Sequence, residues 1–529
     1  MKPMEENINL NKQENEAIDH HESKNEPENG RRKFIKETVA TAIGLTIVPS
    51  YVLGGPKHVA PSDKVNIAYI GLGTQGLREM ADLIELPDVQ ITAVCDPQKK
   101  AINYYDWDDS SLLETWRKLT GNPKLVTGGN NTIPGGLDNG MQFVNSYYAN
   151  KRKTEKYTGC KGYADFRELL TKEKVDAVKI MTTDHVHGLI AMAAMKRGIA
   201  VTMHKPLSNR LIEGKKVIDY AQKSSAVTHL IPWDTNGNMD QIMGWINEGK
   251  IGKLKEVHNW SYRPVWPQYA NIPKETPKIP EGFNWDLWLG PAEKRPYSPH
   301  YTNMVFRGWY DFGGGSMADM GHYSLWTVFN ALGLTSPIII EPNVSHVCDI
   351  EKNTTAYLIN NDFSFPFASS VRFRYPAGNK FGPIDLFWYD GGMRPQTPVE
   401  YFDKNIEFPA EGMMFVGDKG IIMSTEFLVR EAFLLSEGIK EAKDIPPSQG
   451  AVKMPGIRQF IDGVKTGQQI EGNFRQAWPI TEAVNLYAAA VRSGKTLKYD
   501  ASQLKITNVP EANKYLDREY RAGWELDKV

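Results

Sequence analysis

Apolar residues along the chain follow two alternating periods, which predict strands followed by helices from Val65 onward. The stretch VNIAYIG is a short apolar run typical of a buried strand, and TQGLREMADLIEL, which follows it, has apolar residues at helical spacing. VQITAVCD is a second such strand, and the rhythm returns after residue 160. Strands that alternate with helices in this order predict a parallel, doubly wound sheet with right-handed crossovers. The intervening residues 97–160, rich in Gly, Asn, Tyr and Trp, are interpreted as an insertion with a helix or two.

The pattern changes after Trp233. The helical stretch MDQIMGWINEGKIG leads to segments such as LKEVHNWSYRPVW, SSVRFRY, IDLFWYDGG and GMMFVGDKGIIMS. These alternate apolar and polar residues, which suits an antiparallel sheet covered on one face. We therefore expect an α/β protein with a leader over 1–63, a parallel α/β domain over 64–233 with the insertion at about 97–160, and a second α/β domain over 234–529.

The N-terminal segment has the profile of an export signal. Residues 1–29 are polar and acidic, and Arg31–Arg32 then precede the uncharged, mildly apolar run 38–55. That run is too short and polar for a transmembrane helix, so no integral membrane domain is expected. The pattern resembles a twin-arginine signal, which carries folded proteins out of the cytoplasm. It predicts a periplasmic protein, or a membrane-associated one if the signal stays uncleaved. The alternative is a basic surface turn before an amphipathic helix.

Composition narrows the classes of function. The chain has 529 residues and a formal net charge of −1, so its overall charge gives no indication of nucleic-acid or anionic-membrane binding. Its three cysteines form neither a disulfide framework nor a metal cluster, and no metal site is expected.

A glycine-rich loop predicts a dinucleotide site. G-x-G-x-x-G directly follows the first strand and opens the first helix, where free backbone N–H groups and the helix dipole favour a phosphate. Asp96 ends the second strand 20 residues after the last glycine, the spacing expected for a carboxylate on the ribose hydroxyls, which favours NAD over NADP. The alternative is a glycine turn with no nucleotide. The residues assigned to this site are Gly71, Gly73, Thr74, Gln75, Gly76 and Asp96.

Two further strand ends should face the cofactor, because ligands of open α/β sheets bind at the carboxyl ends of strands. AVTMHKPLSN places His204 and Lys205 at one such end, and TTDHVHGLI places Thr183, Asp184 and His187 at another. The alternatives are a solvated lysine, a helix capped by Asp184, and incidental histidines.

At this point the chain resembles the glucose–fructose oxidoreductase / inositol dehydrogenase (Gfo/Idh/MocA) family over roughly residues 64–500. The resemblance rests on YIGLGTQG, VCD, TTDHVHGLIAMAAMKRGIAVTMHKPL, FNWDLWLGPA, FRGWYDFGGGSMADMGHYSLW and FWYDGG taken together. It implies a Rossmann domain followed by an α/β domain with a large, mostly antiparallel open sheet, and a homo-oligomer formed through that sheet. It also implies a catalytic lysine in an E-K-P motif, here Lys205, with His204 in place of the glutamate.

The same resemblance assigns the second half of the site. The family has Asp and His four residues apart on an inward-facing helix, whereas this chain has Asp319 and Tyr323 at that spacing, with His322 one residue earlier. His322 and Tyr323 are therefore rival candidates for the general base, helped by Lys205. Asp319 would orient the base or bind a hydroxyl. A helix cap and a satisfied core histidine are the alternatives for Asp319 and His322.

Substrate contacts are expected from the aromatic-rich stretch that precedes this helix. Arg307 could hold a carboxylate or a pair of hydroxyls, and Trp309 and Tyr310 could cover the apolar face of a sugar ring. The alternatives are a surface ion pair for Arg307 and core or interface packing for the aromatic residues.

These features together predict an NAD-dependent oxidoreductase that acts on a sugar, a sugar derivative or a polyol. An exported enzyme that retains NAD would favour redox-neutral chemistry, so a glycosidase working through a transient keto-sugar, as in some exported family members, is the first alternative. A non-catalytic sugar-binding protein on the same scaffold is the second.

Overall fold

The computed structural model describes residues 59–105, 112–125, 132–232, 239–263, 267–351, 354–359, 361–378, 381–426, 428–429, 431–440 and 455–529. The expected export signal, with Arg31 and Arg32, lies outside these residues. Pro61–Val529 form one compact unit that contains both sheets.

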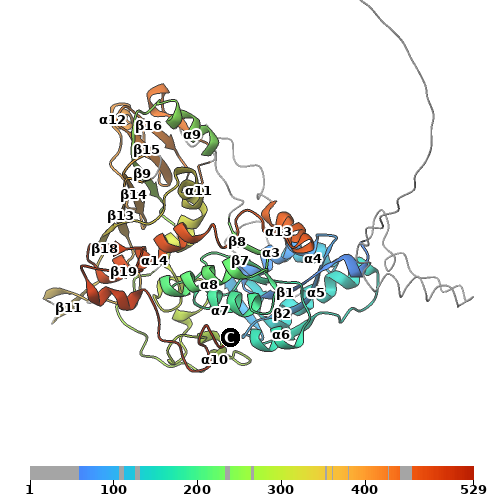
Figure 1. The fold of residues 1–529 in the computed structure, drawn as a ribbon. Helices are drawn as coiled ribbons and strands as arrows, with labels where there is room; N and C mark the ends of the chain where they lie inside the picture. The colour runs from blue at the N-terminus through green and yellow to red at the C-terminus, as the bar shows by residue number, and fades with distance from the viewer. Residues whose placement is uncertain are drawn as a thin grey trace, which may run out of the picture. The chain divides into compact units, whose positions relative to one another are not determined.

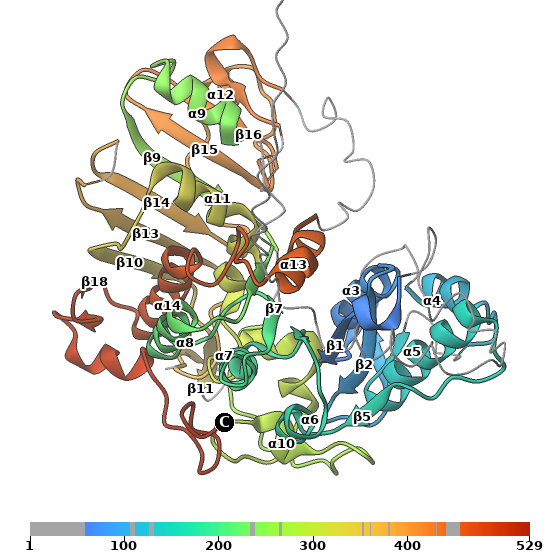
Figure 2. The ribbon, with the colours of Figure 1, turned by 45° about the vertical axis from the view of Figure 1, so that its right-hand side comes forward.

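The first sheet has six parallel strands in the order β5-β2-β1-β6-β7-β8 (Figures 1 and 2). The strands are β1 Val65–Ile70, β2 Val89–Cys95, β5 Lys161–Tyr163, β6 Ala177–Ile180, β7 Ala200–His204 and β8 Thr228–Ile231. Their order changes direction between β1 and β6, which is the switch point where doubly wound sheets bind their ligands. β6 and β7 are buried along their whole length, as expected for parallel strands with both faces covered.

Helices connect these strands. They are α3 Thr74–Ile84, α6 Phe166–Lys172, α7 Asp184–Met195 and α8 Leu211–Lys223. The stretch between β2 and β5 contains four further elements: β3 Ala101–Tyr105, α4 Leu112–Thr120, β4 Thr132–Gly135 and α5 Leu137–Arg152. β3 and β4 pair antiparallel, although α4 separates them in sequence, and they lie next to the glycine-rich loop, where Gly136 N donates to Leu72 O at 3.1 Å.

The second sheet has nine strands in the order β17-β16-β15-β9-β14-β13-β10-β18-β19. β9 and β14 are parallel, and the other neighbouring strands are antiparallel. The strands are β9 Leu254–Trp260, β10 Ile339–Val344, β13 Ser369–Tyr375, β14 Ile384–Tyr389, β15 Gly412–Gly417, β16 Ile421–Ser424, β17 Phe433–Leu434, β18 Leu497–Asp500 and β19 Lys505–Ile506. β13 and β14 alternate buried and half-buried residues, so one face of this sheet is covered and the other is open, as the sequence pattern predicts.

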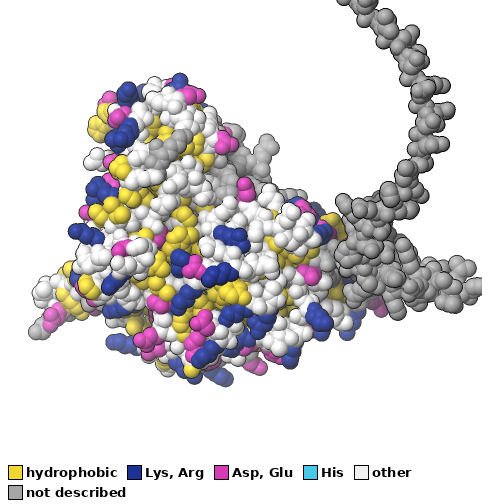
Figure 3. Space-filling view, viewed as in Figure 1, with side chains coloured by type: hydrophobic (Ala, Val, Ile, Leu, Met, Phe, Trp, Pro, Cys, Tyr) yellow, Lys and Arg dark blue, Asp and Glu magenta, His cyan; other side chains and the backbone are white. Residues whose placement is uncertain are grey.

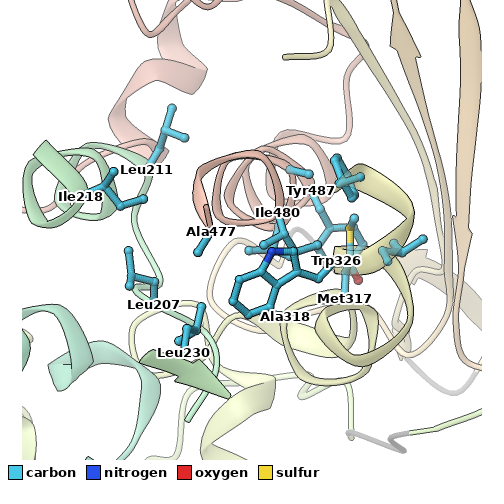
Figure 4. Packing of buried hydrophobic residues seen from close by; sticks show 14 of the residues in the cluster. Leu207, Leu211, Ile218, Leu230, Met317, Ala318, Trp326, Ala477, Ile480 and Tyr487 are labelled. Carbon is cyan, nitrogen blue, oxygen red and sulfur yellow. The ribbon is translucent and has the colours of Figure 1, made fainter. Parts of the chain in front are cut away.

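Helices α11 and α14 cover the buried face and join it to the first sheet. The helices of this half are α9 Met239–Asn247, α10 Trp285–Leu289, α11 His322–Leu332, α12 Val399–Asp403, α13 Pro455–Thr466 and α14 Trp478–Ser493, with a π-helical turn, η4 Met317–Gly321, directly before α11. Figure 4 shows Met317, Trp326, Ile480 and Tyr487 packed together, with Leu207 and Leu230 of the first half nearby. They belong to one continuous hydrophobic core.

Short elements complete the chain. They are the hairpin β11 Cys348–Glu351 with β12 Thr355–Leu358, and the single turns η1 Pro61–Asp63, η2 Pro299–Tyr301, η3 Asn303–Gly308, η5 Leu435–Glu437 and η7 Pro510–Tyr515. α13 is late in the sequence, yet it contacts β1, β7 and β8 of the first sheet, where Phe460 and Ile461 are buried. The C-terminal half therefore contributes to the packing of both sheets.

The predicted fold class is confirmed: a parallel six-stranded Rossmann-like sheet is followed by a large, mostly antiparallel sheet. On the face in Figure 3, acidic and basic side chains are interspersed, in keeping with the near-zero net charge. Within the described part of the chain, no helix has the length and apolar character needed to cross a membrane.

Candidate active site

A cavity of about 890 Å³ lies at the carboxyl ends of β1, β2, β6 and β7. Its lining combines the glycine-rich loop of the first half with side chains of η3, η4 and α11 from the second half. The residues expected in the site that line it are Gly71, Gly73, Thr74, Gln75, Gly76, Asp96, Thr183, His204, Lys205, Arg307, Asp319 and Tyr323.

The glycine-rich loop has the geometry of a phosphate cradle. Gly71 has φ +101°, and a Cβ there would lie 2.4 Å from Met181 O, so a side chain would clash with β6. A Cβ on Gly76 would lie 2.4 Å from Gly71 O, which explains why helix and loop can pack this closely. Gly73 precedes α3 and no side chain caps this helix, so its N-terminus is available to an anion.

Asp96 is held rigidly beside this loop. Its carboxylate accepts hydrogen bonds from Leu72 N at 2.9 Å and Gln98 N at 2.8 Å. Burial raises the pKa of Asp96 to about 6, although both hydrogen bonds favour the anion. A buried carboxylate at the end of β2, next to a side-chain-free loop and an uncapped helix start, fits NAD: Asp96 would hold ribose hydroxyls, and the loop would hold the pyrophosphate.

Lys205 and Asp319 form an ion pair across the two halves of the unit. Lys205 directly follows β7, and Asp319 lies on the π-helical turn η4. Burial lowers the pKa of Lys205 to about 8, against the opposing effect of Asp319. Burial alone would raise the pKa of Asp319, but Arg307 and Lys205 outweigh it and leave that pKa below its usual value. Lys205 is therefore a lysine that can change protonation state near neutral pH.

Arg307 links Asp319 to the first half. Its Nε is 3.5 Å from Asp319 Oδ1, and its Nη2 is 3.5 Å from Asp184 Oδ1. Asp184 also accepts from Gly314 N at 3.0 Å and is fully buried, so it does not line the cavity and does not cap α7. Asp184 and Arg307 instead hold the loop before η4 against the first sheet.

Tyr323 enters the cavity beside Lys205. The Lys205 Nζ lies 4.9 Å from the centre of the Tyr323 ring, and the Tyr323 hydroxyl lies 3.1 Å from His204 Nε2. Asp319 and Tyr323 are four residues apart and both line the cavity, as expected for one face of a helix. A phenol next to an ammonium group is a suitable acid–base group, because the cation stabilises the phenolate.

His322, the rival candidate, lies in the core instead. It is fully buried, its Nδ1 is 3.0 Å from Ala318 O, and it does not line the cavity. Burial lowers its pKa to about 3, so it stays neutral. His187 also lies outside the cavity lining: its ring nitrogens face Pro206 O at 2.7 Å and Thr182 O at 3.0 Å, where it supports the two strand ends.

The two aromatic residues expected to contact substrate are likewise packed away from the cavity. Trp309 donates its ring N–H to His300 O at 2.7 Å and stacks on Tyr269 at 4.3 Å. Tyr310 packs on Phe365 and beneath Arg492. Their core-packing interpretation fits these contacts better than sugar stacking.

The cavity lining also includes side chains that sequence reasoning did not assign to the site. Tyr104 of β3 lies against Gly73, and Trp524 of the C-terminal tail lies beneath Arg167, whose guanidinium is 4.0 Å from its ring. Arg263, paired with Glu411 at 2.8 Å, and Trp288 are two further examples. The sequence of an insertion or a tail has no periodicity that predicts which distant strand end it will contact. Only the aromatic content of these stretches was visible in the sequence.

Family comparisons agree with this architecture. The model described as "Oxidoreductase family, NAD-binding Rossmann fold" matches residues 136–231, and the model described as "Oxidoreductase family, C-terminal alpha/beta domain" matches 238–351 and 443–526. Both are Gfo/Idh/MocA models, and together they span more than half of the chain. The chain belongs to the Gfo/Idh/MocA oxidoreductase family. The predictions of this family and of an NAD-binding Rossmann domain are confirmed.

Among curated relatives, a glycosyl hydrolase family 109 protein of Shewanella pealeana is 23% identical over 42% of this chain and 44% of the relative. A levoglucosan dehydrogenase of Pseudarthrobacter phenanthrenivorans is 27% identical over 21% of this chain and 28% of the relative. The chain thus spans less than half the length of these relatives. Among solved structures, the WlbA dehydrogenase of Bordetella pertussis, in complex with NADH and UDP-GlcNAcA, is 11% identical over 83% of this chain and 99% of its own, with a TM-score of 0.48.

Proposed function

We propose that this protein is an NAD-dependent oxidoreductase that oxidises a hydroxyl-bearing carbon of a sugar, a sugar derivative or a polyol. The observation that carries the proposal is the Lys205–Asp319 pair beside Tyr323, in a cavity that continues into the glycine-rich loop. When bound, NAD supplies the acceptor for the hydride.

The chain's own residues would manage the proton and the alkoxide. Lys205 would donate a hydrogen bond to the substrate oxygen and stabilise the developing negative charge. Tyr323 would remove the hydroxyl proton, and Asp319 would keep Lys205 charged and in place. Arg307, with Arg263 across the cavity, would bind further hydroxyls or an acidic group of the sugar.

A redox-neutral glycosidase is the second candidate, favoured by the similarity to family 109 glycosyl hydrolases and to a protein named alpha-N-acetylgalactosaminidase from Shewanella oneidensis. In this reaction the same residues would oxidise the sugar transiently, the aglycone would leave by elimination, and water would add before the keto group is reduced. The buried Lys205, which pairs with Asp319, argues against a sugar-binding protein without activity.

The test begins with the cofactor. Acid treatment of the purified protein should release NAD(H) in near-equal amount with the chain, and Asp96→Ala should relax the preference for NAD over NADP. The loaded enzyme is then given sugars, polyols and glycosides without added NAD. One turnover with NADH formation identifies the dehydrogenase, whereas continued turnover with release of an aglycone identifies the glycosidase. No nucleotide and no NAD binding by calorimetry would overturn both.

Three further features are proposed with this function. The division at 64–233 and 234–529 would separate cofactor binding from substrate binding and oligomerisation. The half-buried face of the nine-stranded sheet, where His258 stacks on Phe387 at 4.5 Å, would form a homo-oligomer, which light scattering can test. The Arg31–Arg32 signal would export the folded protein to the periplasm.

A further inference from the structure

The Tyr323 hydroxyl is the first member of a second set of polar groups, which is buried. Besides the Tyr323 contact at 3.1 Å, His204 Nε2 lies 3.4 Å from Glu79 Oε1. His204 ends β7, whereas Glu79 lies on α3, the helix that begins at the glycine-rich loop. The contacts therefore lead from the cavity into the space between α3 and the sheet.

Two further contacts hold the Glu79 carboxylate in place. Its Oε2 is 2.5 Å from Lys179 Nζ on β6, and its Oε1 accepts from Gln75 Nε2 at 3.1 Å. The side chains of Glu79 and Lys179 are only 3% and 2% exposed. Burying two charges is costly, and a buried pair of this kind is not needed for fold stability, because apolar residues of similar size often do as well. The contact of Glu79 with His204 suggests a role for the pair in the active site.

Tyr323 needs such a partner if it is to remove a proton. A phenol that still carries its own proton cannot bind a second one. It can take the proton of a substrate hydroxyl only if it passes its own to another group. His204 Nε2 lies at hydrogen-bonding distance from the Tyr323 oxygen, and in the tautomer with its proton on Nδ1 this nitrogen can accept a proton.

We propose that Tyr323 and His204 form a proton relay, with His204 as the final proton acceptor and Glu79 and Lys179 as positioning residues. The O–H bond of the substrate breaks and its proton moves to Tyr323 Oη. The original Tyr323 proton moves to His204 Nε2, where it forms an imidazolium ion. The neighbouring C–H bond breaks, its electron pair leaves as hydride to NAD, which is the oxidant, and the carbon becomes a carbonyl. The relay rests on the proposed oxidoreductase function.

The resting His204 ring is neutral. Burial, with Lys205, Lys179, Arg307 and His187 nearby, holds the pKa of His204 well below its usual value, and these groups oppose its protonation. Glu79 then faces the new imidazolium ion and stabilises it. Reduction of the nicotinamide also removes one positive charge from the site, so the transferred proton keeps its net charge constant.

His204→Gln and Tyr323→Phe test the relay in the full chain. Each should lower kcat for the sugar by roughly 10²–10⁴-fold, the usual effect of losing acid–base assistance, while NAD content and KM change little. Because the two residues act as a unit, the double variant should be about as slow as either single variant. His229→Gln is the matched control: His229 is also a buried histidine of this sheet, on β8, and bonds Thr202 rather than a site residue. Multiplicative losses in the double variant, or a His204→Gln variant with normal kcat, would overturn the relay.

The Glu79→Gln variant distinguishes a role of Glu79 in proton transfer from a purely structural role. Loss of the carboxylate lowers the proton affinity of His204, so the acidic limb of the kcat profile should move to lower pH while kcat itself falls. A merely structural Glu79 would lower thermal stability and leave the position of that limb unchanged. If the lone Lys179 charge prevents folding, Glu79→Gln with Lys179→Met removes both charges. Because Lys179 lowers the pKa of His204, its loss opposes the loss of Glu79, so the limb should then lie near its wild-type position while kcat still falls.

NMR spectroscopy tests the relay without enzyme turnover. In protein labelled with ¹⁵N-histidine and loaded with NAD, the His204 Nε2 signal is assigned by its loss in His204→Gln. Tyr323→Phe should shift it toward the value of an imine nitrogen that accepts no hydrogen bond, and an unchanged signal would overturn the relay. If wild-type protein binds NAD but oxidises no sugar or polyol, the proposed function fails, and this signal still decides whether Tyr323 and His204 share a proton.

Discussion

At the residue scale, the site depends on which of two neighbouring side chains enters the cavity. His322 and Tyr323 are adjacent in sequence, and sequence reasoning left both as the base. The structure places the His322 ring against Ala318 O in the core and the Tyr323 hydroxyl beside His204 at the cavity. The preceding π-helical turn, Met317–Gly321, sets this orientation, and such turns are frequent at functional sites. Hydrophobic periodicity alone does not reveal a single π turn, which is why the choice was open.

The first prediction at this scale concerns Lys205. Lys205→Ala should lower turnover by roughly 10²–10⁴-fold, because the alkoxide loses its buried cation, and should leave NAD binding intact. Tyr323→Phe should cost far more activity than His322→Ala, whose effect should be confined to thermal stability. Steady-state kinetics with the NAD content of each variant measure this. A larger kcat loss in His322→Ala than in Tyr323→Phe would reverse the assignment.

At the element scale, many strands and helices were predictable, because burial on one or both faces gives the sequence a characteristic period. β13, β14 and α14 fall where alternation or helical spacing placed them, whereas β10, β18 and β19 of the same sheet were not predicted. The packing partners were not predictable. α13 follows the second sheet in sequence yet packs on the first, and the paired strands β3 and β4 bring Tyr104 to Gly73. Amphipathicity shows that a helix has an apolar face, but it does not say which sheet covers that face.

Asp88 provides a measurable link between α13 and the first sheet. Its carboxylate accepts two hydrogen bonds from Arg458 at 2.7 Å each and pairs with Lys465. The Arg458 hydrogen bond holds the pKa of Asp88 well below its usual value. A depressed folded-state pKa gives stability that is present above the unfolded pKa of about 4 and is lost as pH falls further.

Asp88→Asn should therefore lower the free energy of unfolding by about 1–2 kcal/mol at pH 7, the range for charge-assisted hydrogen bonds at a partly exposed site. The difference from wild type should narrow below pH 4. Denaturant titrations at several pH values measure it. Glu511→Gln, which removes an exposed ion pair with Lys495, is the control and should leave stability near the wild-type value. A difference that does not depend on pH would mean that the Asp88 charge does not hold α13.

At the scale of the whole molecule, the two sheets and the C-terminal tail all contribute walls to one cavity. Tyr104 comes from the insertion, Trp524 from the tail, and Tyr323 from the second half. A cofactor enclosed by three distant parts of the chain can be held only once the chain has folded. NAD binding therefore requires the folded chain. The proposed export signal at Arg31–Arg32 would then have to act on a folded chain that already carries its NAD.

Replacing Arg31 and Arg32 together by lysine tests that expectation. The double variant keeps both positive charges, so a merely basic N-terminal turn would be unaffected, whereas a twin-arginine signal would fail and leave the protein in the cytoplasm. Cell fractionation with immunoblotting measures the distribution, and Lys36→Gln, which leaves the arginine pair intact, is the control. The retained variant should still release NAD(H) in near-equal amount with the chain, because loading precedes export. A normal periplasmic yield of the double variant would show that the arginine pair is not an export signal, and retained protein without NAD would show that the cofactor is not loaded in the cytoplasm.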